Sequence, residues 1–141
     1  MKWITRQNAK VDRVACPWLI KRFVDPDAEF VYVPADRVLG DAQRLEARSF
    51  DAEGAEFGHR GNTCTFETLI AAFHLTDAAL HRLARIVHGA DIPQDLSVAP
   101  EAAGLLAISE GLATTCADDH RKLELMFPIY DALYAHCQAK A

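Results

Sequence analysis

The sequence has 141 residues and a formal net charge of −5, with half of its residues hydrophobic and a quarter charged. This length fits one domain with its own core, and the composition excludes a disordered chain. The Lys and Arg residues form no basic stripe, and no apolar run approaches the ~20 residues of a membrane-spanning helix, so we expect neither nucleic-acid binding nor membrane insertion.

The N-terminus has no apolar stretch behind a basic start, so we expect no secretory signal and a cytoplasmic location. Four cysteines stand far apart in the chain: Cys16, Cys64, Cys116 and Cys137. Because none belongs to a Cys-x-x-Cys pair, we expect free thiols rather than disulfides or a thiolate zinc cage.

The first part of the chain predicts a small sheet. Strands are expected over residues 3–5 and 29–33, where β-prone residues alternate, and shorter ones over 48–51 and 55–57. A helix is expected over 35–44.

Between the first two strands, four apolar residues recur at helical spacing: Val14, Trp18, Leu19 and Phe23. The start of this helix has two interpretations. Either Asp12 is the N-cap and Pro17 tightens the second turn, or the helix begins at Pro17 with Cys16 as its cap.

The remainder of the chain predicts four helices, over about 66–73, 76–89, 100–112 and 118–137. We therefore expect an α+β fold, in which residues 1–141 form a mostly helical single domain with a small three- to four-stranded sheet.

No recognised catalytic or phosphate-binding motif is present, so any chemistry must come from dispersed residues. The candidate metal ligands lie at helix ends or in a glycine-rich loop: His59, Glu67, His88, Asp91, Asp119 and His120. We predict that they supply one pocket together with Cys64. A mixed set of histidine and carboxylate ligands suits Zn, Fe or Mn, and no organic cofactor is indicated.

Local geometry supports two pairs of these candidate ligands. Asp119 and His120 fall within about 60° of the centre of the apolar stripe on the last helix. His88 and Asp91 flank Gly89, so both side chains can point to one place. Each candidate also has a structural interpretation, as a helix cap or a satisfied core histidine.

Cys16 and Cys64 are the candidate catalytic thiols. Cys64 lies at the start of a predicted helix, where the helix dipole lowers the pKa of a thiol and favours the thiolate. The alternative is that both are small buried apolar groups.

Five residues near the N-terminus are candidates for binding a small ligand: Arg6, Asp12, Arg13, Trp18 and Arg22. Arg13 and Arg22, with a helix N-terminus, would form a cradle for a tetrahedral oxyanion. The alternatives are structural ion pairs for the charged residues and a core position for Trp18.

Residues 3–6 and 12–25, the latter including Asp-Arg-Val-Ala-Cys-Pro-Trp-Leu-Ile, closely resemble the opening of the ChrB C-terminal domain, a chromate-resistance protein family. Later blocks match in the same order: 64–67, 88–91, 100–105, 118–119 and 130–134. The resemblance covers nearly the whole chain.

The resemblance implies an association with chromate-resistance operons. Full-length members act as chromate-responsive transcription regulators and have an additional N-terminal half, assigned to DNA binding, which this sequence does not include. The regulator role is therefore not carried over to this chain, and the resemblance brings no catalytic residue set.

Three functions remain open, in this order. The first is a domain that binds an oxyanion such as chromate, a divalent metal, or both, in a polar pocket. The second is a metal- or thiol-dependent, oxidoreductase-like enzyme acting on chromate or a related oxidant. The third is a structural or partner-binding domain. The sequence leaves the oligomeric state open.

Overall fold

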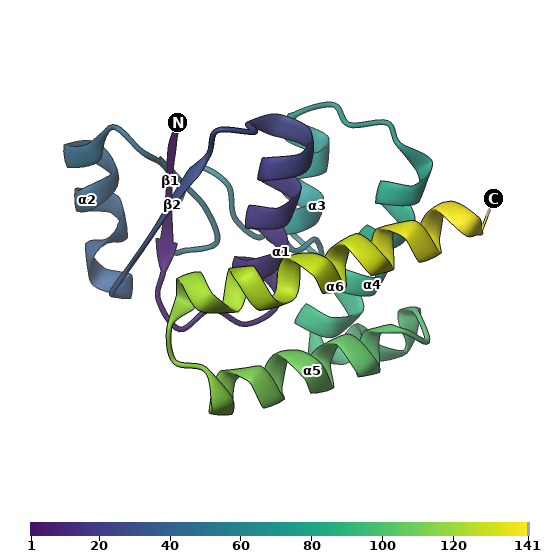
Figure 1. Ribbon diagram of the computed structural model, residues 1–141. Helices are drawn as coiled ribbons and strands as arrows, with labels where there is room; N and C mark the ends of the chain where they lie inside the picture. The colour runs from purple at the N-terminus through teal and green to yellow at the C-terminus, as the bar shows by residue number, and fades with distance from the viewer. Residues whose placement is uncertain (141) are drawn as a thin grey trace.

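The computed structural model describes residues 1–140, in which a small sheet lies at one end of a body of helices (Figure 1). Its strands are β1 (Lys2–Arg6), β2 (Glu29–Val33) and β3 (Arg48–Ser49), all parallel and in the order β2-β1-β3. The predicted α+β fold with a three- to four-stranded sheet is confirmed.

A long helical segment connects β1 to β2. It begins as α1 (Asp12–Leu19) and continues as a π-helical turn, η1 (Ile20–Val24). Pro17 lies in the second turn of α1, as the first interpretation predicted, but the N-cap position is Val11 rather than Asp12, and the start at Pro17 is wrong. Pro17 has no backbone N–H, so it cannot donate to the carbonyl of Arg13, four residues earlier. That carbonyl instead accepts a hydrogen bond from the hydroxyl of Tyr32 on β2, at 2.7 Å.

The other elements follow in chain order. They are η2 (Ala35–Arg37), α2 (Val38–Leu45), α3 (Thr65–Ala72), α4 (Ala78–Asp91), η3 (Pro93–Val98), α5 (Ala102–Thr115) and α6 (Asp119–Ala139). The strand predicted over 55–57 is wrong: only an isolated bridge joins Phe57 to Phe50. Residues 50–64 are therefore mostly a loop, which later supplies part of the site.

The core lies where α1, α3, α4 and α6 meet beside the sheet. Trp18 is 1% exposed, packs on Phe23, Tyr130 and Tyr134, and donates from Nε1 to Asp131 of α6 at 2.7 Å. Trp18 is thus a core side chain that ties α1 to α6.

The C-terminal end of α4 is held by close packing at Gly89. A Cβ atom placed there would lie 2.8 Å from Cβ of Ala102 on α5 and 3.1 Å from a methyl group of Val98 on η3. The absence of a side chain at Gly89 therefore lets α5 and η3 approach α4 beside His88 and Asp91.

Among the described residues, no helix has both the length and the apolar character needed to cross a membrane.

Candidate functional site

Four side chains from distant parts of the chain converge on one point. We call them the acidic centre: Asp12 at the start of α1, Asp51 after β3, His59 in the following loop, and Asp91 at the end of α4. Nε2 of His59 lies 3.3 Å from Oδ2 of Asp12 and 3.4 Å from Oδ1 of Asp51. Oδ2 of Asp91 lies 3.2 Å from the same nitrogen. Three carboxylates thus surround one imidazole nitrogen.

Asp12 is fixed by the helix that lies across from it. Its carboxylate is buried and accepts the backbone N–H groups of Thr65 and Phe66, at 2.7 and 3.2 Å, in the first turn of α3. A carboxylate at this position satisfies free N–H groups and interacts favourably with the helix dipole. Asp12 therefore stabilises a helix more than 50 residues away in the chain, and its orientation is set by α3.

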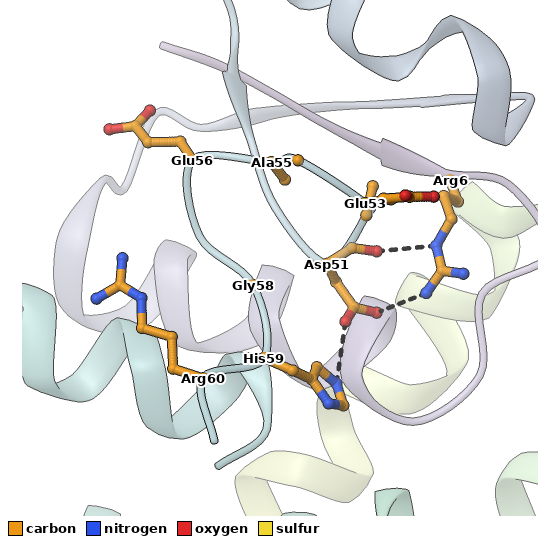
Figure 2. Close-up of a pocket in the computed structure, with 10 residues that line it drawn as sticks. Arg6, Asp51, Glu53, Ala55, Glu56, Gly58, His59 and Arg60 are labelled. Carbon is orange, nitrogen blue, oxygen red and sulfur yellow. Dashed lines mark hydrogen bonds and ion pairs between the residues drawn. The ribbon is translucent and has the colours of Figure 1, made fainter. Parts of the chain in front are cut away.

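Asp51 is held between a hydroxyl and two arginines. It adopts a left-handed backbone conformation (φ 48°), and its Oδ1 accepts a hydrogen bond from the Thr65 hydroxyl at 2.8 Å. Guanidinium nitrogens of Arg6 and Arg13 each lie 3.6 Å from its Oδ2. Figure 2 shows Asp51 between Arg6 and His59. Asp51 is not among the candidates expected from the sequence, where it is only a polar residue at the end of a short predicted strand.

The electrostatics of the acidic centre follow from burial and crowding. Burial and the neighbouring Asp12 raise the pKa of Asp51. Burial, followed by the negative charges of Asp12 and Asp51, raises the pKa of Asp91 to about 7. The hydrogen bond to Asp12 is the main cause that raises the pKa of His59 to about 9. The acidic centre therefore favours the binding of additional positive charge.

His59 separates two openings on the surface. A cavity of about 440 Å³ is lined by Arg6, Asp51, His59 and Arg60 among others (Figure 2). A second cavity, of about 480 Å³, is lined by His59 and Asp91. Small ions can thus reach the acidic centre from either side.

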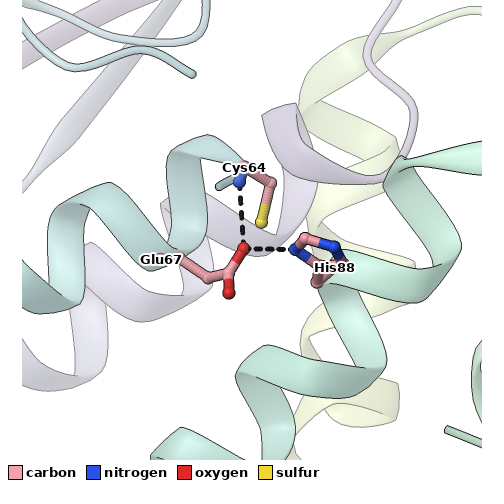
Figure 3. A group of neighbouring side chains, drawn as sticks. All are labelled: Cys64, Glu67 and His88. Carbon is pink, nitrogen blue, oxygen red and sulfur yellow. Dashed lines mark hydrogen bonds and ion pairs between the residues drawn. The ribbon is translucent and has the colours of Figure 1, made fainter. Parts of the chain in front are cut away.

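A second group lies at the start of α3 and is called the thiol cluster: Cys64, Glu67 and His88 (Figure 3). Oε1 of Glu67 accepts the backbone N–H of Cys64 at 3.0 Å and lies 2.5 Å from Nδ1 of His88. The other nitrogen of His88, Nε2, lies 2.7 Å from Oδ2 of Asp95 on η3. Asp95, which the η3 turn brings back toward α4, is likewise not among the candidates expected from the sequence.

The expected low pKa of the Cys64 thiol is wrong. Burial, and after it the negative charge of Asp12, raises the pKa of Cys64 and that of Cys16. These effects outweigh the dipole of α3. The Cys16 thiol instead donates to Asp12 at 3.6 Å. Both candidate catalytic thiols are therefore buried and protonated at neutral pH in the ion-free protein.

The candidate metal ligands and Cys64 fall into two groups rather than the single predicted pocket. Asp119 and His120 lie outside both groups. Asp119 is buried and accepts the backbone N–H groups of Asn8 and Ala9 at 2.9 and 2.8 Å. His120 is exposed and packs edge-on against Tyr32. The core-facing end of α6 thus meets the segment after β1, which explains the amphipathic position of Asp119 without a metal.

The predicted cradle of Arg13 and Arg22 is not formed, because each guanidinium faces a different carboxylate. Arg22 donates twice to Asp131, at 3.1 and 3.0 Å. Arg13 lies beside Asp51, and its buried Nε has no hydrogen-bond partner among residues 1–140. Arg6, rather than Arg22, is the second arginine beside Arg13.

Tyr130 on α6 is a further polar residue that the sequence marked only as part of an apolar face. It is fully buried, and within the described chain its hydroxyl has no hydrogen-bond partner. Burial raises the pKa of this hydroxyl, and Asp12, Cys16, Asp91 and Cys64 raise it further, in that order. Members of both groups therefore act electrostatically on this hydroxyl.

Comparison with known proteins agrees with the sequence blocks described above. The family described as "ChrB, C-terminal domain" matches residues 3–137. "Protein ChrB" of Cupriavidus metallidurans is 38% identical over 136 residues, which are 96% of this chain and 40% of that protein. The chain thus spans about two fifths of the length of this relative. No solved structure matches. The chain belongs to the ChrB C-terminal domain family.

Proposed function

We propose that this chain binds a divalent cation at the acidic centre, with Asp12, His59 and Asp91 as ligands and Asp51 beside them. The observation that carries the proposal is the convergence of three carboxylates on one imidazole nitrogen, at 3.2 to 3.4 Å. One potential ligand atom from each of Asp12, His59 and Asp91 lies within 4.8 Å of the others.

Charge balance supports a cation rather than an anion at this point. Buried carboxylates are costly unless they are paired or coordinate a metal. The two nearby arginines both face Oδ2 of Asp51, which leaves His59 to balance Asp12 and Asp91. A divalent ion that binds His59 in place of the Nε2 proton, which is released to solvent, adds one net positive charge.

The unpartnered hydroxyl of Tyr130 gives independent support. A buried hydroxyl without a partner costs free energy, and such groups in proteins commonly contact an ion or a water molecule. Asp12 and Asp91 are among the charges that raise the pKa of this hydroxyl, so it lies within electrostatic range of an ion bound between them.

The ligand types select among metals. Two carboxylates and one imidazole are hard or intermediate donors, which suit Mn, Fe(II) or Zn. These are the metals expected from the sequence. The proposed ligands, however, do not include Asp119 and His120.

A second, dependent function is oxyanion binding. Arg6 and Arg60 line the 440 Å³ cavity beside the acidic centre. A cation with an open coordination position, flanked by guanidinium groups, would hold a tetrahedral oxyanion. Chromate is the oxyanion to test, because the family resemblance implies an association with chromate resistance. Thiol-dependent reduction has less support, since both candidate thiols are buried.

The test of metal binding is calorimetric titration of Mn²⁺ into chelator-treated protein. We expect one ion per chain, and affinity at least tenfold lower in Asp91→Asn and His59→Ala, about 1.4 kcal/mol or more. Asp41→Asn is the matched control, because Asp41 of α2 is a buried carboxylate outside the site, paired with Arg37 of η2 and Arg44 of α2. Wild-type affinity in both site variants would overturn the proposal and favour a structural role.

Oxyanion binding is tested by titrating chromate, and sulfate as a non-oxidising comparison, into metal-free and Mn²⁺-loaded protein. We expect binding only to the loaded form, with an affinity reduced about tenfold or more by Arg6→Gln. Arg22→Lys is the control, because Asp131 holds this arginine elsewhere. Equal binding to both forms, or no effect of Arg6→Gln, would contradict this function.

A further inference from the structure

We propose that the thiol cluster is a second, separate metal site, in which Cys64, Glu67 and His88 bind zinc. This inference goes beyond the proposed function, because it involves other ligands, a different class of donor and a second ion.

The donors are brought together by two helices. Cys64 is the N-cap residue of α3 and Glu67 is three residues further on, so both side chains lie on one side of the first turn. His88 reaches them from the last turn of α4 (Figure 3). One potential ligand atom of each residue lies within 4.8 Å of the others. Ligand atoms of tetrahedral zinc are roughly 3.5 Å apart, given bonds of about 2.0–2.3 Å, so the 2.5 Å contact between Glu67 and His88 would lengthen by roughly 1 Å.

The orientation of His88 is that of a metal ligand with a supporting carboxylate. A histidine that binds a metal usually donates its other ring N–H to a carboxylate, which fixes the ring and the tautomer. Nε2 of His88 is paired with Asp95 at 2.7 Å, so Nδ1 is the nitrogen available to an ion. Nδ1 is also the nitrogen that faces Glu67 at 2.5 Å. An ion would replace the proton shared by these two groups, and that proton would be released to solvent.

The thiol explains why this site differs from the acidic centre. A sulfur ligand beside an imidazole and a carboxylate favours zinc over Mn²⁺ or Mg²⁺, whereas the acidic centre contains only oxygen and nitrogen donors. A zinc ion would take Cys64 as the thiolate, with its proton released to solvent. Three protein ligands leave a fourth position open.

An entry path exists at Glu67. This residue lies on the wall of a largely apolar cavity of about 610 Å³ between α3 and α4, which Ile70, Leu75 and Ala84 also line. Cys64 is fully buried, while Glu67 and His88 are half-buried. An ion can therefore reach the cluster from the Glu67 side and be enclosed on the Cys64 side.

The test uses Co²⁺ as a spectroscopic probe for zinc on the chelator-treated full chain. Cobalt bound to a thiolate gives a charge-transfer band in the near ultraviolet. We expect this band to saturate at one thiolate-bound cobalt ion per chain, and to be lost when zinc is added. Cys64→Ser and His88→Ala should abolish the band, whereas Cys137→Ser, which removes another buried thiol, should keep it.

Further variants separate this site from the acidic centre and from unfolding. Asp95→Asn should retain the band but weaken zinc binding by about 10- to 100-fold, as expected for a positioning residue. Asp91→Asn should retain the band while losing Mn²⁺ affinity. If thermal melting shows that Cys64→Ser does not fold, Glu67→Gln takes its place. No band in the wild type, or a band that persists without Cys64 or Glu67, would overturn the proposal.

Discussion

At the scale of single residues, buried polar groups serve partners far away in the chain. The sequence suggested Asp12 as a cap for its own helix, but its carboxylate caps α3. Asp119 likewise holds the backbone after β1 rather than a metal. Local patterns show that such residues are polar and near a helix end. They cannot show which distant N–H group donates to the carboxylate, because that depends on tertiary packing.

Trp18 gives a prediction at this scale. Its indole is buried among aromatic rings, and its N–H is bonded to Asp131. Trp18→Ala should therefore lower the free energy of unfolding by about 3–5 kcal/mol, because it leaves a cavity and removes a partly buried hydrogen bond. Urea unfolding measures the change. A variant as stable as the wild type would show that this side chain is not a core element.

At the scale of elements, the helices were predictable and the loop was not. The i, i+3, i+4 spacing of apolar residues identified α3, α4 and α6, because their buried faces are continuous. The strand expected over 55–57 failed because its neighbours supply a single bridge. That loop carries Asp51 and His59, so half of the acidic centre comes from the part of the chain with no periodic pattern.

The contact between α4 and α5 predicts opposite effects for two glycines. Gly89→Ala should destabilise the protein by about 1–3 kcal/mol, because the new methyl group meets Ala102 at 2.8 Å. Gly111→Ala on α5 should stabilise it by up to about 1 kcal/mol, since alanine is the better helix former and no atom lies within 4 Å. Thermal melting of both variants checks this. A similar change in both would contradict the close packing at Gly89.

The contacts of Asp131 on α6 with Trp18 and Arg22 predict that the free energy of unfolding depends on pH. The hydrogen bond from Arg22, together with that from Trp18, lowers the pKa of Asp131. A carboxyl with a lowered pKa stabilises the fold above its unfolded pKa, and this contribution is lost as the pH falls through the folded value. Asp131→Asn should therefore reduce the loss of stability in acid, measured by urea unfolding from neutral to acidic pH. Asp36→Asn, an exposed carboxylate on η2, should leave the acid profile unchanged. An unchanged profile in Asp131→Asn would contradict this pH dependence.

At the scale of the whole molecule, composition and sequence blocks were sufficient for the fold class and the family. They could not divide the candidate ligands into two groups, because the division depends on how α3 and α4 cross. His88 and Asp91 are three residues apart on α4, yet each belongs to a different group. Asp51, Asp95 and Tyr130 were missed because nothing in their local sequence differs from ordinary turn or core residues.

The net charge predicts the behaviour of the whole chain toward DNA. Phosphate contacts dominate protein–DNA affinity, and this chain has a formal charge of −5 without a basic stripe. We expect no useful affinity for duplex DNA at physiological salt, measured by fluorescence anisotropy with a random duplex. Submicromolar binding that weakens with added salt would contradict this expectation.

The central claim, that the acidic centre holds a divalent cation, is tested most directly by anomalous diffraction from crystals grown with Mn²⁺. We predict an anomalous peak between Asp12, His59 and Asp91, with oxygen and nitrogen ligands at about 2.0–2.2 Å, as in other carboxylate–imidazole metal sites. A well-ordered acidic centre with no anomalous peak in the presence of excess Mn²⁺ would contradict it.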